Sequence, residues 1–357
     1  MELIRIKIKE LAAFSKGELF QNFEIKPVSP LRIESYISNP RAKEEDPVLY
    51  ILIENGKLIA FRTVLPDMIY DHKNTPLRFA WCSGVWSDPT FRGKKLWEPL
   101  LEAPLEDWNN KLLFTNYAPI IQALYTRNNL FKLAIPRQGY RFYFRPDFKE
   151  LFKNRISNPV FKPLLSAANA IASLLYTLKS CFSTSLPDIK IEEIDYPDRD
   201  CIELLENYSG SSLFGRGEKE FNWIINQPWV MKEKDPSCRY PFSYDRIEYK
   251  IKIVKQFSQN IFSGFFIYST INREMKVLYC FGKNDTETSA TIPILQIAKT
   301  NNISHLTVLS SSISKAIRGK PGYYLFSKSY SSNIYSSFNF PHHDLSVFDG
   351  DGDNCFT

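Results

Sequence analysis

Alternation of apolar and polar residues at the start of the chain predicts β-strands that each bury one face. Glu2 to Lys9 alternate in this way, and Val48 to Glu54 and Lys57 to Leu65 are expected as two further strands. The last two segments flank Asn55-Gly56, a pair that favours the positive φ angles of a two-residue hairpin turn. Leu77 to Trp86 is apolar on both faces, which is typical of a strand in the middle of a sheet. We therefore expect a hairpin next to a central strand.

Other patterns in the first half predict helices and shorter strands around this hairpin. A largely helical region lies between the first strand and the hairpin, up to about Ser38. A polar loop then connects the hairpin to the central strand. This loop is expected at Pro66–Thr75. After the central strand we expect a helical stretch to Trp108, a strand at Lys111–Thr115, a helix at about Pro119–Asn129 and a strand near Tyr140–Arg145.

The second half repeats this order without obvious sequence identity. The expected elements are strands at Tyr249–Phe257 and Ile261–Thr270 around a turn, a strand at Lys276–Phe281, a helix around Thr286–Thr300, a strand at Ser304–Leu309 and a helix at Ser311–Ile317. The recurrence indicates an α+β fold of two duplicated domains, each a mixed, mostly antiparallel twisted sheet flanked by helices. We place the first domain at 1–150, a linker helix region at 151–188 and the second domain at 189–357.

One uncharged apolar segment, Pro163 to Leu178, lies between the two halves. It is shorter than the ~20 residues of a membrane-spanning helix, so no membrane span is expected. Apolar side chains recur in it at spacings of three and four, which predicts one apolar helix face. We interpret it as a linker helix that packs this face against one or both domains, and a helix on a membrane surface is the alternative. The residues of the stripe are Leu164, Ala168, Ile171, Leu175 and Leu178.

The composition is that of an ordinary globular protein. The chain has 357 residues, and 45 Lys and Arg against 39 Asp and Glu give a formal net charge of +6. That excess is too small for the dense basic surface of a dedicated nucleic-acid binder, so no DNA partner is expected. Six cysteines without close pairs and four histidines match neither a disulfide scaffold nor a metal site. Because the N-terminus lacks the apolar stretch of a signal peptide, we expect a cytoplasmic protein.

A basic turn after the central strand is the segment that suggests chemistry. Asp88-Pro89 ends the strand, and the turn that follows leads into a helix. Unpaired N–H groups at the start of a helix, with the positive end of its dipole, bind phosphate groups. Arg92, Lys94 and Lys95 add positive charge for phosphate oxygens. The alternative is an ordinary strand-to-helix turn with a solvated basic face.

The turn resembles part of the acetyl-CoA-binding core of the GNAT N-acetyltransferase superfamily. The resembling pattern is Val-x-x-x-Pro-x-x-Arg-Gly-Lys between a strand and a helix. In that family the turn usually reads Arg/Gln-x-x-Gly-x-Gly/Ala and holds the pyrophosphate of the cofactor. Arg92 matches the first position and is followed by Gly93 and Lys94, whereas Lys95 and Trp97 occupy the two positions that are usually glycine.

The resemblance implies an acyltransferase that takes acetyl-CoA or another acyl-CoA as co-substrate. The turn from Arg92 to Leu96 would hold the pyrophosphate. Gly84 marks a bulge near the end of the central strand, and the N–H groups of Gly84, Val85 and Trp86 would polarise the thioester carbonyl. The acceptor implied by the family is an amine, with an amino sugar of surface-polysaccharide metabolism as one candidate.

A second match to the family lies in the helix that follows. Tyr125 matches the tyrosine that often protonates the departing CoA thiolate, and a half-buried structural tyrosine is the alternative. A base, or a water that relays the proton to one, would deprotonate the acceptor. Asp67, Asp71 and His72, in the loop before the central strand, are the candidates, and nothing in the sequence chooses among them.

The whole-chain pattern resembles tandem-GNAT proteins, a set that includes Fem-like aminoacyl transferases. The second half carries Phe281-Gly282-Lys283-Asn284-Asp285 where the basic turn would stand, so we expect a degenerate second copy. Two other functions stay open. One is a non-catalytic scaffold that has lost the cofactor, and the other is a Fem-like transferase that uses aminoacyl-tRNA.

The chain's C-terminal residues alternate carboxylates with glycine in Asp349-Gly350-Asp351-Gly352-Asp353. This resembles the opening of a calcium loop, but the glutamate at its twelfth position is missing. We therefore expect no metal there and interpret the segment as an acidic tail, either solvated or docked on the protein.

Overall fold

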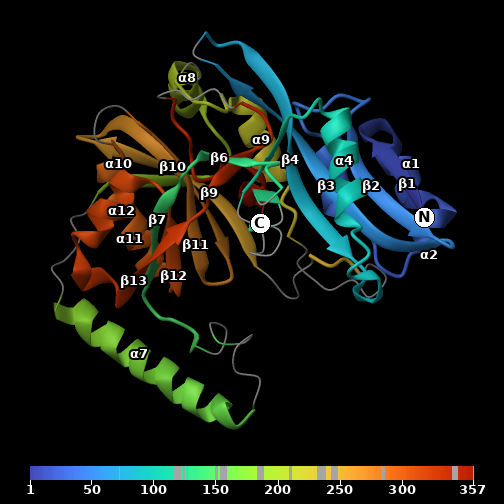
Figure 1. The fold of residues 1–357 in the computed structure, drawn as a ribbon. Helices are drawn as coiled ribbons and strands as arrows, with labels where there is room; N and C mark the ends of the chain where they lie inside the picture. Colours follow the sequence, from blue (N-terminus) through green and yellow to red (C-terminus); the bar gives the residue numbers. More distant parts are fainter. Residues whose placement is uncertain are drawn as a thin grey trace.

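The structure is a computed structural model that describes residues 1–71, 73–115, 122–123, 125–126, 128–148, 152, 159–182, 189–208, 211–230, 239–242, 248–282, 286–339 and 345–356. These residues form two seven-stranded mixed sheets flanked by helices (Figure 1). The predicted α+β fold with two mixed sheets is confirmed.

The first sheet is mixed because one pair of its strands is parallel. In spatial order it contains β1 (Glu2–Lys7), β2 (Pro47–Glu54), β3 (Lys57–Tyr70), β4 (Pro76–Ser87), β5 (Leu112–Phe114), β14 (Ile334–Ser336) and β6 (Lys132–Ile135). β4 and β5 run parallel and pair only at Ala80–Leu112 and Trp81–Leu113. Among the described residues, the end of β4 therefore has a partner strand only on its β3 side.

The second sheet has the same plan. In spatial order it contains β13 (Phe326–Ser331), β7 (Gln138–Tyr143), β12 (His305–Val308), β11 (Glu274–Gly282), β10 (Ile261–Ile271), β9 (Tyr249–Ser258) and β8 (Ile191–Ile194). Its parallel pair is β11 with β12, and this pairing covers only the first three residues of β11.

Each half of the chain supplies one strand to the other half's sheet. β7 follows β6 closely in sequence, yet it lies between β12 and β13 in the second sheet. β14 comes from the second half and lies between β5 and β6 in the first sheet. The two sheets therefore do not separate at one point of the chain, and the division at residues 150 and 189 stays a prediction.

The hairpin of β2 and β3 forms where the sequence predicts it. Asn55 and Gly56 have φ angles of 51° and 74°, which a two-residue turn between twisted strands requires. β3 is longer than predicted and runs through Pro66 to Tyr70, so the polar loop before β4 shortens to a few residues. Proline is tolerated there because Ala80, opposite Pro66, donates its N–H to the carbonyl of Lys111 on the far side of β4.

Helices cover both faces of each sheet (Figure 1). α1 (Ile8–Lys16), α2 (Glu18–Asn22) and α3 (Pro30–Ile37) pack on one face of the first sheet, and α4 (Trp97–Asp107) packs on the other. The core under α1–α3 continues without a break through α8 (Arg199–Tyr208) and α9 (Glu218–Asn226) to the second sheet. The other face of the second sheet is covered by α10 (Thr286–Ser289), α11 (Thr291–Thr300) and α12 (Ser311–Arg318).

α7 (Lys162–Phe182) projects from the rest of the protein (Figure 1). Ala172 and Tyr176 are its buried side chains, whereas Leu164, Ile171 and Leu175 of the predicted stripe are 64%, 59% and 53% exposed. The interpretation that this stripe packs against a domain is therefore wrong, because a neighbouring, narrower face, about 100° further round the helix, makes the contact. None of the described helices combines the length and the apolar character needed to cross a membrane.

The acidic C-terminal segment is docked between the two sheets. The N–H of Gly350 donates to the carbonyl of Leu278 at 2.7 Å, and the Asp351 carboxylate is fully buried. Among the described residues, no group of three or more His, Cys, Asp or Glu side chains is placed to hold a metal ion. The segment ends in the short helix η4 (Asp353–Phe356).

Candidate functional site

The basic turn after β4 directs several backbone N–H groups to one side. Asp88 starts it by accepting a hydrogen bond from the N–H of Thr90 at 2.8 Å, in the short helix η1 (Pro89–Phe91). The hydrogen bonds from Thr90 lower the pKa of Asp88, so its carboxylate stays charged at neutral pH. The chain then turns through Gly93 and Lys95, with φ angles of 87° and 54°, into the first turn of α4.

Lys95 and Leu96 give this turn the geometry of an anion-binding nest. Lys95 is left-handed, and Leu96 after it is right-handed with φ −58° and ψ −16°. Alternation of this kind points successive N–H groups to one side. Within the described part of the chain, the N–H groups of Lys95, Leu96 and Trp97 donate to no protein acceptor. The free amides, at the start of a helix, are available to an anion.

The side chains around the nest leave it open and positively charged. Lys95 is 72% exposed, and its Nζ reaches the Glu98 carboxylate in the first turn of α4 at 3.4 Å. Lys94 and Arg92 are exposed, with the Lys94 Nζ over the Phe91 ring at 4.3 Å. Trp97 packs into the core beneath α4. A side chain at each of the usual glycine positions therefore does not fill the turn.

β4 carries a bulge, as its glycine predicts. The register with β3 shifts between Arg62–Val85 and Val64–Cys82. The N–H of Gly84 donates to Thr63 Oγ1 at 2.9 Å, so this amide is not available to a ligand. A Cβ at Gly84 would lie within 3.0 Å of Phe242 and 3.1 Å of Thr63, which explains why glycine stands there.

The next amide along β4, that of Val85, faces the side where β4 lacks a strand partner. The N–H of Asp88 donates to the carbonyl of Ile59 at 2.8 Å. Because bonded and non-bonded pairs alternate in an antiparallel ladder, Trp86 is the next bonded residue and the N–H of Val85 points away from β3. Of the three predicted carbonyl-polarising amides, Val85 is the one that this geometry leaves exposed toward β5.

Tyr125 is brought to the bulge from the helical segment after β5. It is fully buried, and its hydroxyl accepts a hydrogen bond from Arg62 of β3. Phe114 and Phe131 hold its ring from the sides, with ring centroids 5.5 and 5.3 Å away. Burial raises the pKa of Tyr125 more than the nearby Arg62 lowers it, so the phenol stays protonated at neutral pH. Cys82 of β4, whose pKa burial also raises, completes this buried group.

The opposite face of β4 carries a carboxylate that sequence reasoning missed. Ser83 Oγ donates to Asp353 Oδ2 at 2.6 Å and accepts a hydrogen bond from Arg32. Arg32 also donates to Tyr240 Oη at 2.8 Å, and its guanidinium lies 3.9 Å from the Trp229 ring centroid. Asp353 was visible only as part of an acidic tail, because nothing local to it indicates contact with β4.

The three sequence candidates for a base do not meet at this place. Asp67 is buried between two guanidiniums, Arg41 at 2.8 Å and Arg216 at 2.9 Å. Burial alone would raise the pKa of Asp67, but these two charges lower it, so it is a structural anion. Asp71 accepts from backbone N–H groups of its own loop. His72 lies outside the described residues.

Comparisons with known proteins place the fold. No known family profile and no curated protein sequence matches the chain. Solved structures do match in fold. The GCN5-related N-acetyltransferase of Anabaena variabilis has 11% identity and a TM-score of 0.50, over 94% of this chain and 71% of its own. A probable N-acyltransferase of Enterococcus faecalis has 9% identity and a TM-score of 0.50, over 94% and 72%.

A eukaryotic enzyme shares the same fold. N-myristoyltransferase of Saccharomyces cerevisiae, solved with bound myristoyl-CoA and inhibitors, has 13% identity and a TM-score of 0.50, over 94% of this chain and 80% of its own. Because each match extends over nearly the whole chain, it includes both sheets. The two-sheet α+β fold is therefore GNAT-like over nearly the whole chain, whereas the duplication of one domain stays a prediction.

Proposed function

We propose that this protein is an acyltransferase that moves an acyl group from acyl-CoA to an amine. The observation that carries the proposal is the nest of free N–H groups at Lys95–Trp97, set at the helix start that follows β4. Such a site favours a diphosphate over a neutral ligand, because the amides and the helix dipole all present positive charge. Arg92 and Lys94 add charge at its rim.

The residues at the β4 bulge supply the groups that acyl transfer requires. The Val85 amide, open on the β5 side, would donate to the thioester carbonyl oxygen as negative charge develops there. The amine nitrogen bonds to the acyl carbon as the carbon–sulfur bond breaks. Tyr125, which accepts a hydrogen bond from Arg62, keeps its own proton and would give it to the leaving thiolate.

Asp353 is our proposed base for the amine. Its Oδ2 is 2.6 Å from Ser83 Oγ, on the face of β4 opposite Cys82 and Tyr125. A proton from the attacking amine would pass to Asp353, directly or through the Ser83 hydroxyl. The acid and the base would then act from opposite faces of one strand, so neither competes for the other's position.

The length of the acyl chain and the chemical class of the acceptor are proposed separately from the reaction type. The matching structures include an N-acetyltransferase and an N-myristoyltransferase, so we propose to test both short and long acyl chains. Amino sugars are our first acceptor class, with other small amines next. We place the reaction in the cytoplasm, where acyl-CoA is available and the buried thiols of Cys82, Cys201, Cys280 and Cys355, which form no disulfide, stay reduced.

Calorimetric titration with acetyl-CoA and myristoyl-CoA tests the proposal. We expect binding that weakens about tenfold or more in the double variant Arg92→Ala/Lys94→Ala, since charge-assisted phosphate contacts are lost. Lys16→Ala is the matched control, because Lys16 is exposed on α1 and α1 packs on the opposite face of the sheet from α4. Absence of binding at millimolar acyl-CoA would favour a scaffold, and binding of aminoacyl-tRNA alone would favour a Fem-like transferase.

A further inference from the structure

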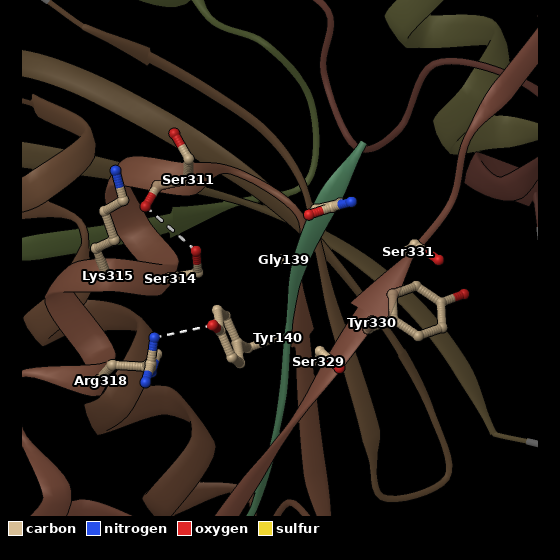
Figure 2. A pocket seen from close by; sticks show the side chains of 10 residues that line it. Gly139, Tyr140, Ser311, Ser314, Lys315, Arg318, Ser329, Tyr330 and Ser331 are labelled. Atoms are coloured by element: carbon tan, nitrogen blue, oxygen red, sulfur yellow. Dashed lines mark hydrogen bonds between the residues drawn. The ribbon is translucent and has the colours of Figure 1, made fainter. Parts of the chain in front are cut away.

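A separate cavity lies in the second half of the molecule, between α12 and the strand pair β7 and β13. Its volume is about 480 Å³, within the range of small-molecule sites. Figure 2 shows the side chains of α12 on one side, β7 at the back and β13 on the other side. Figure 1 places these elements in the second sheet, away from α4 and the nest.

Regular spacing on each element makes the cavity polar. On α12, Ser314 and Lys315 lie three and four residues after Ser311, and Arg318 lies four and three residues after them, so the four share one side of the helix. On the strands, Gln138 pairs with Ser331 and Tyr140 with Ser329, and paired residues of adjacent strands point to the same side of a sheet.

Gly139 keeps the back of the cavity bare. A Cβ there would lie 2.0 Å from the carbonyl oxygen of Val308 and 2.5 Å from Leu309 Cα, so the close approach of β12 excludes every other residue type. Only backbone therefore lines the cavity at this position.

The charge of the cavity is positive and one of its cations is held in place. Arg318 Nη1 donates to Tyr140 Oη at 2.8 Å, and the guanidinium lies 4.4 Å from the centroid of the Tyr140 ring (Figure 2). These two contacts hold the guanidinium beside the Tyr140 ring. Lys315 lies one turn earlier on the same face, and the lining includes no carboxylate. Two cations without an acidic partner in the lining favour an anionic ligand.

We propose that this cavity binds an anion that also carries hydroxyl groups, of the class of a sugar phosphate. Arg318 and Lys315 would bind the phosphate, since a guanidinium matches two oxygens of a phosphate group. Serine hydroxyls both donate and accept, which matches the hydroxyls of a polyol. Four serines, at positions 311, 314, 329 and 331, line the cavity. The site is independent of the nest, so it stands or falls separately from the acyltransferase proposal.

Calorimetry or ligand-observed NMR with glucose 6-phosphate, inorganic phosphate and glucose tests the proposal on the full chain. We expect glucose 6-phosphate to bind more tightly than either of the other two probes. Arg318→Gln should weaken its binding about tenfold or more, since a charged hydrogen-bond donor is lost. Ser329→Phe should abolish binding by filling the cavity without a change of charge. Arg199→Gln is the matched control, because Arg199 is 90% exposed on α8.

The outcomes separate the parts of the proposal. Equal affinity for inorganic phosphate and glucose 6-phosphate would overturn the assigned class, because the serines would then contribute nothing. Binding that survives Ser329→Phe, or no binding by any probe, would overturn the site. Each variant should keep the far-UV circular dichroism spectrum of the wild type, which shows that the protein is folded.

Discussion

Lys95 is a residue at which charge and backbone conformation can be separated by substitution. It holds φ at 54°, a region that costs a residue with a Cβ roughly 1–2 kcal/mol and costs glycine little. The same residue contributes a charge that is 72% exposed. If the amides form the binding site, the conformation decides affinity and the charge has only a small effect.

Two substitutions at Lys95 test this. Lys95→Gly removes the charge and keeps the left-handed turn, so we expect the Kd for acetyl-CoA to change by no more than about threefold. Lys95→Val removes the same charge, but a β-branched residue disfavours positive φ, so we expect the Kd to rise about tenfold or more. Calorimetry of the two variants gives the answer. Equal weakening in both would show that charge, not the amide nest, holds the ligand.

Tyr125 is buried deeply enough that structural and chemical roles must be distinguished. Tyr125→Phe removes the hydroxyl that accepts from Arg62 and should destabilise the protein by about 1–3 kcal/mol. If the phenol protonates the thiolate, kcat should also fall about a hundredfold or more while the KM for acyl-CoA is unchanged. Steady-state kinetics, with a thiol reagent that detects the released CoA, measure kcat and KM, and urea unfolding measures the stability. A loss of stability with an unaltered kcat would leave Tyr125 a purely structural residue.

Asp67 gives the protein an acid-sensitive centre. Its folded pKa is lowered, so the stability it contributes is present above the unfolded value of about 3.9 and is lost as the pH falls through the folded value. Asp351, whose pKa burial raises, changes stability in the opposite direction. Asp67→Asn should cost about 3–5 kcal/mol at pH 7, because Arg41 and Arg216 would be left buried without this partner.

Urea unfolding of wild type and Asp67→Asn from pH 7 to pH 3 isolates that contribution. The difference in unfolding free energy between the two should shrink below about pH 4, since Asp351 is present in both. Glu34→Gln, at an exposed site on α3, is the control for loss of a carboxylate. A difference that is independent of pH would refute the charge assignment.

At the scale of single elements, α7 is held by few contacts. Tyr176 packs against Phe144 with ring centroids 6.0 Å apart and under the Arg145 guanidinium at 4.9 Å. Lys179 adds a hydrogen bond to the carbonyl of Tyr324 at 2.8 Å. A helix held by so few buried groups opens more readily than the sheets do.

We therefore expect Tyr176→Ala to release α7. Hydrogen exchange followed by mass spectrometry should show faster exchange across α7 and unchanged exchange in β9–β11. Leu175→Ala, on the 53% exposed face of the same helix, should leave the exchange of α7 nearly unchanged. A larger effect from Leu175 than from Tyr176 would mean that the apolar stripe is covered in solution.

Local elements were predictable because their signals are local. Asn55-Gly56 sets the hairpin by its turn geometry alone, and the two-sided apolar pattern of β4 marks a central strand wherever it occurs. α7 was predicted as a helix correctly but with the wrong buried face. Periodicity finds an apolar stripe, yet only the tertiary neighbours decide which side of the helix is covered.

The candidate site was predictable only where its residues follow one another along the chain. The turn from Arg92 to Leu96 is one such run, and its anion-binding geometry was expected from sequence. Asp353 meets Ser83 across 270 positions, and no sequence pattern reports that contact. Separation in sequence also hid Arg216 as a partner of Asp67, which the sequence analysis placed in a loop as a candidate base.

At the scale of the whole molecule, strand exchange and the shared core join the two sheets into one unit. We expect a single cooperative unfolding transition, because neither sheet can lose its neighbour's strand and stay complete. Far-UV circular dichroism reports both sheets, and tryptophan fluorescence reports mainly the core around the first sheet, where Trp81 and Trp223 are buried. Coincident urea transitions are expected, and two resolved midpoints would show that the halves unfold separately.

The placement of β14 also governs how the protein is made. Leu112 of β5 and Ser337, next to β14, hydrogen-bond across 225 positions of sequence, so β5 and β6 emerge from the ribosome long before the strand that joins them. Until then the nascent chain presents two open strand edges, which invite pairing with other chains. Synthesis of this protein therefore includes a long interval in which chaperones are its natural protection, and slower translation of the second half would lengthen that exposure.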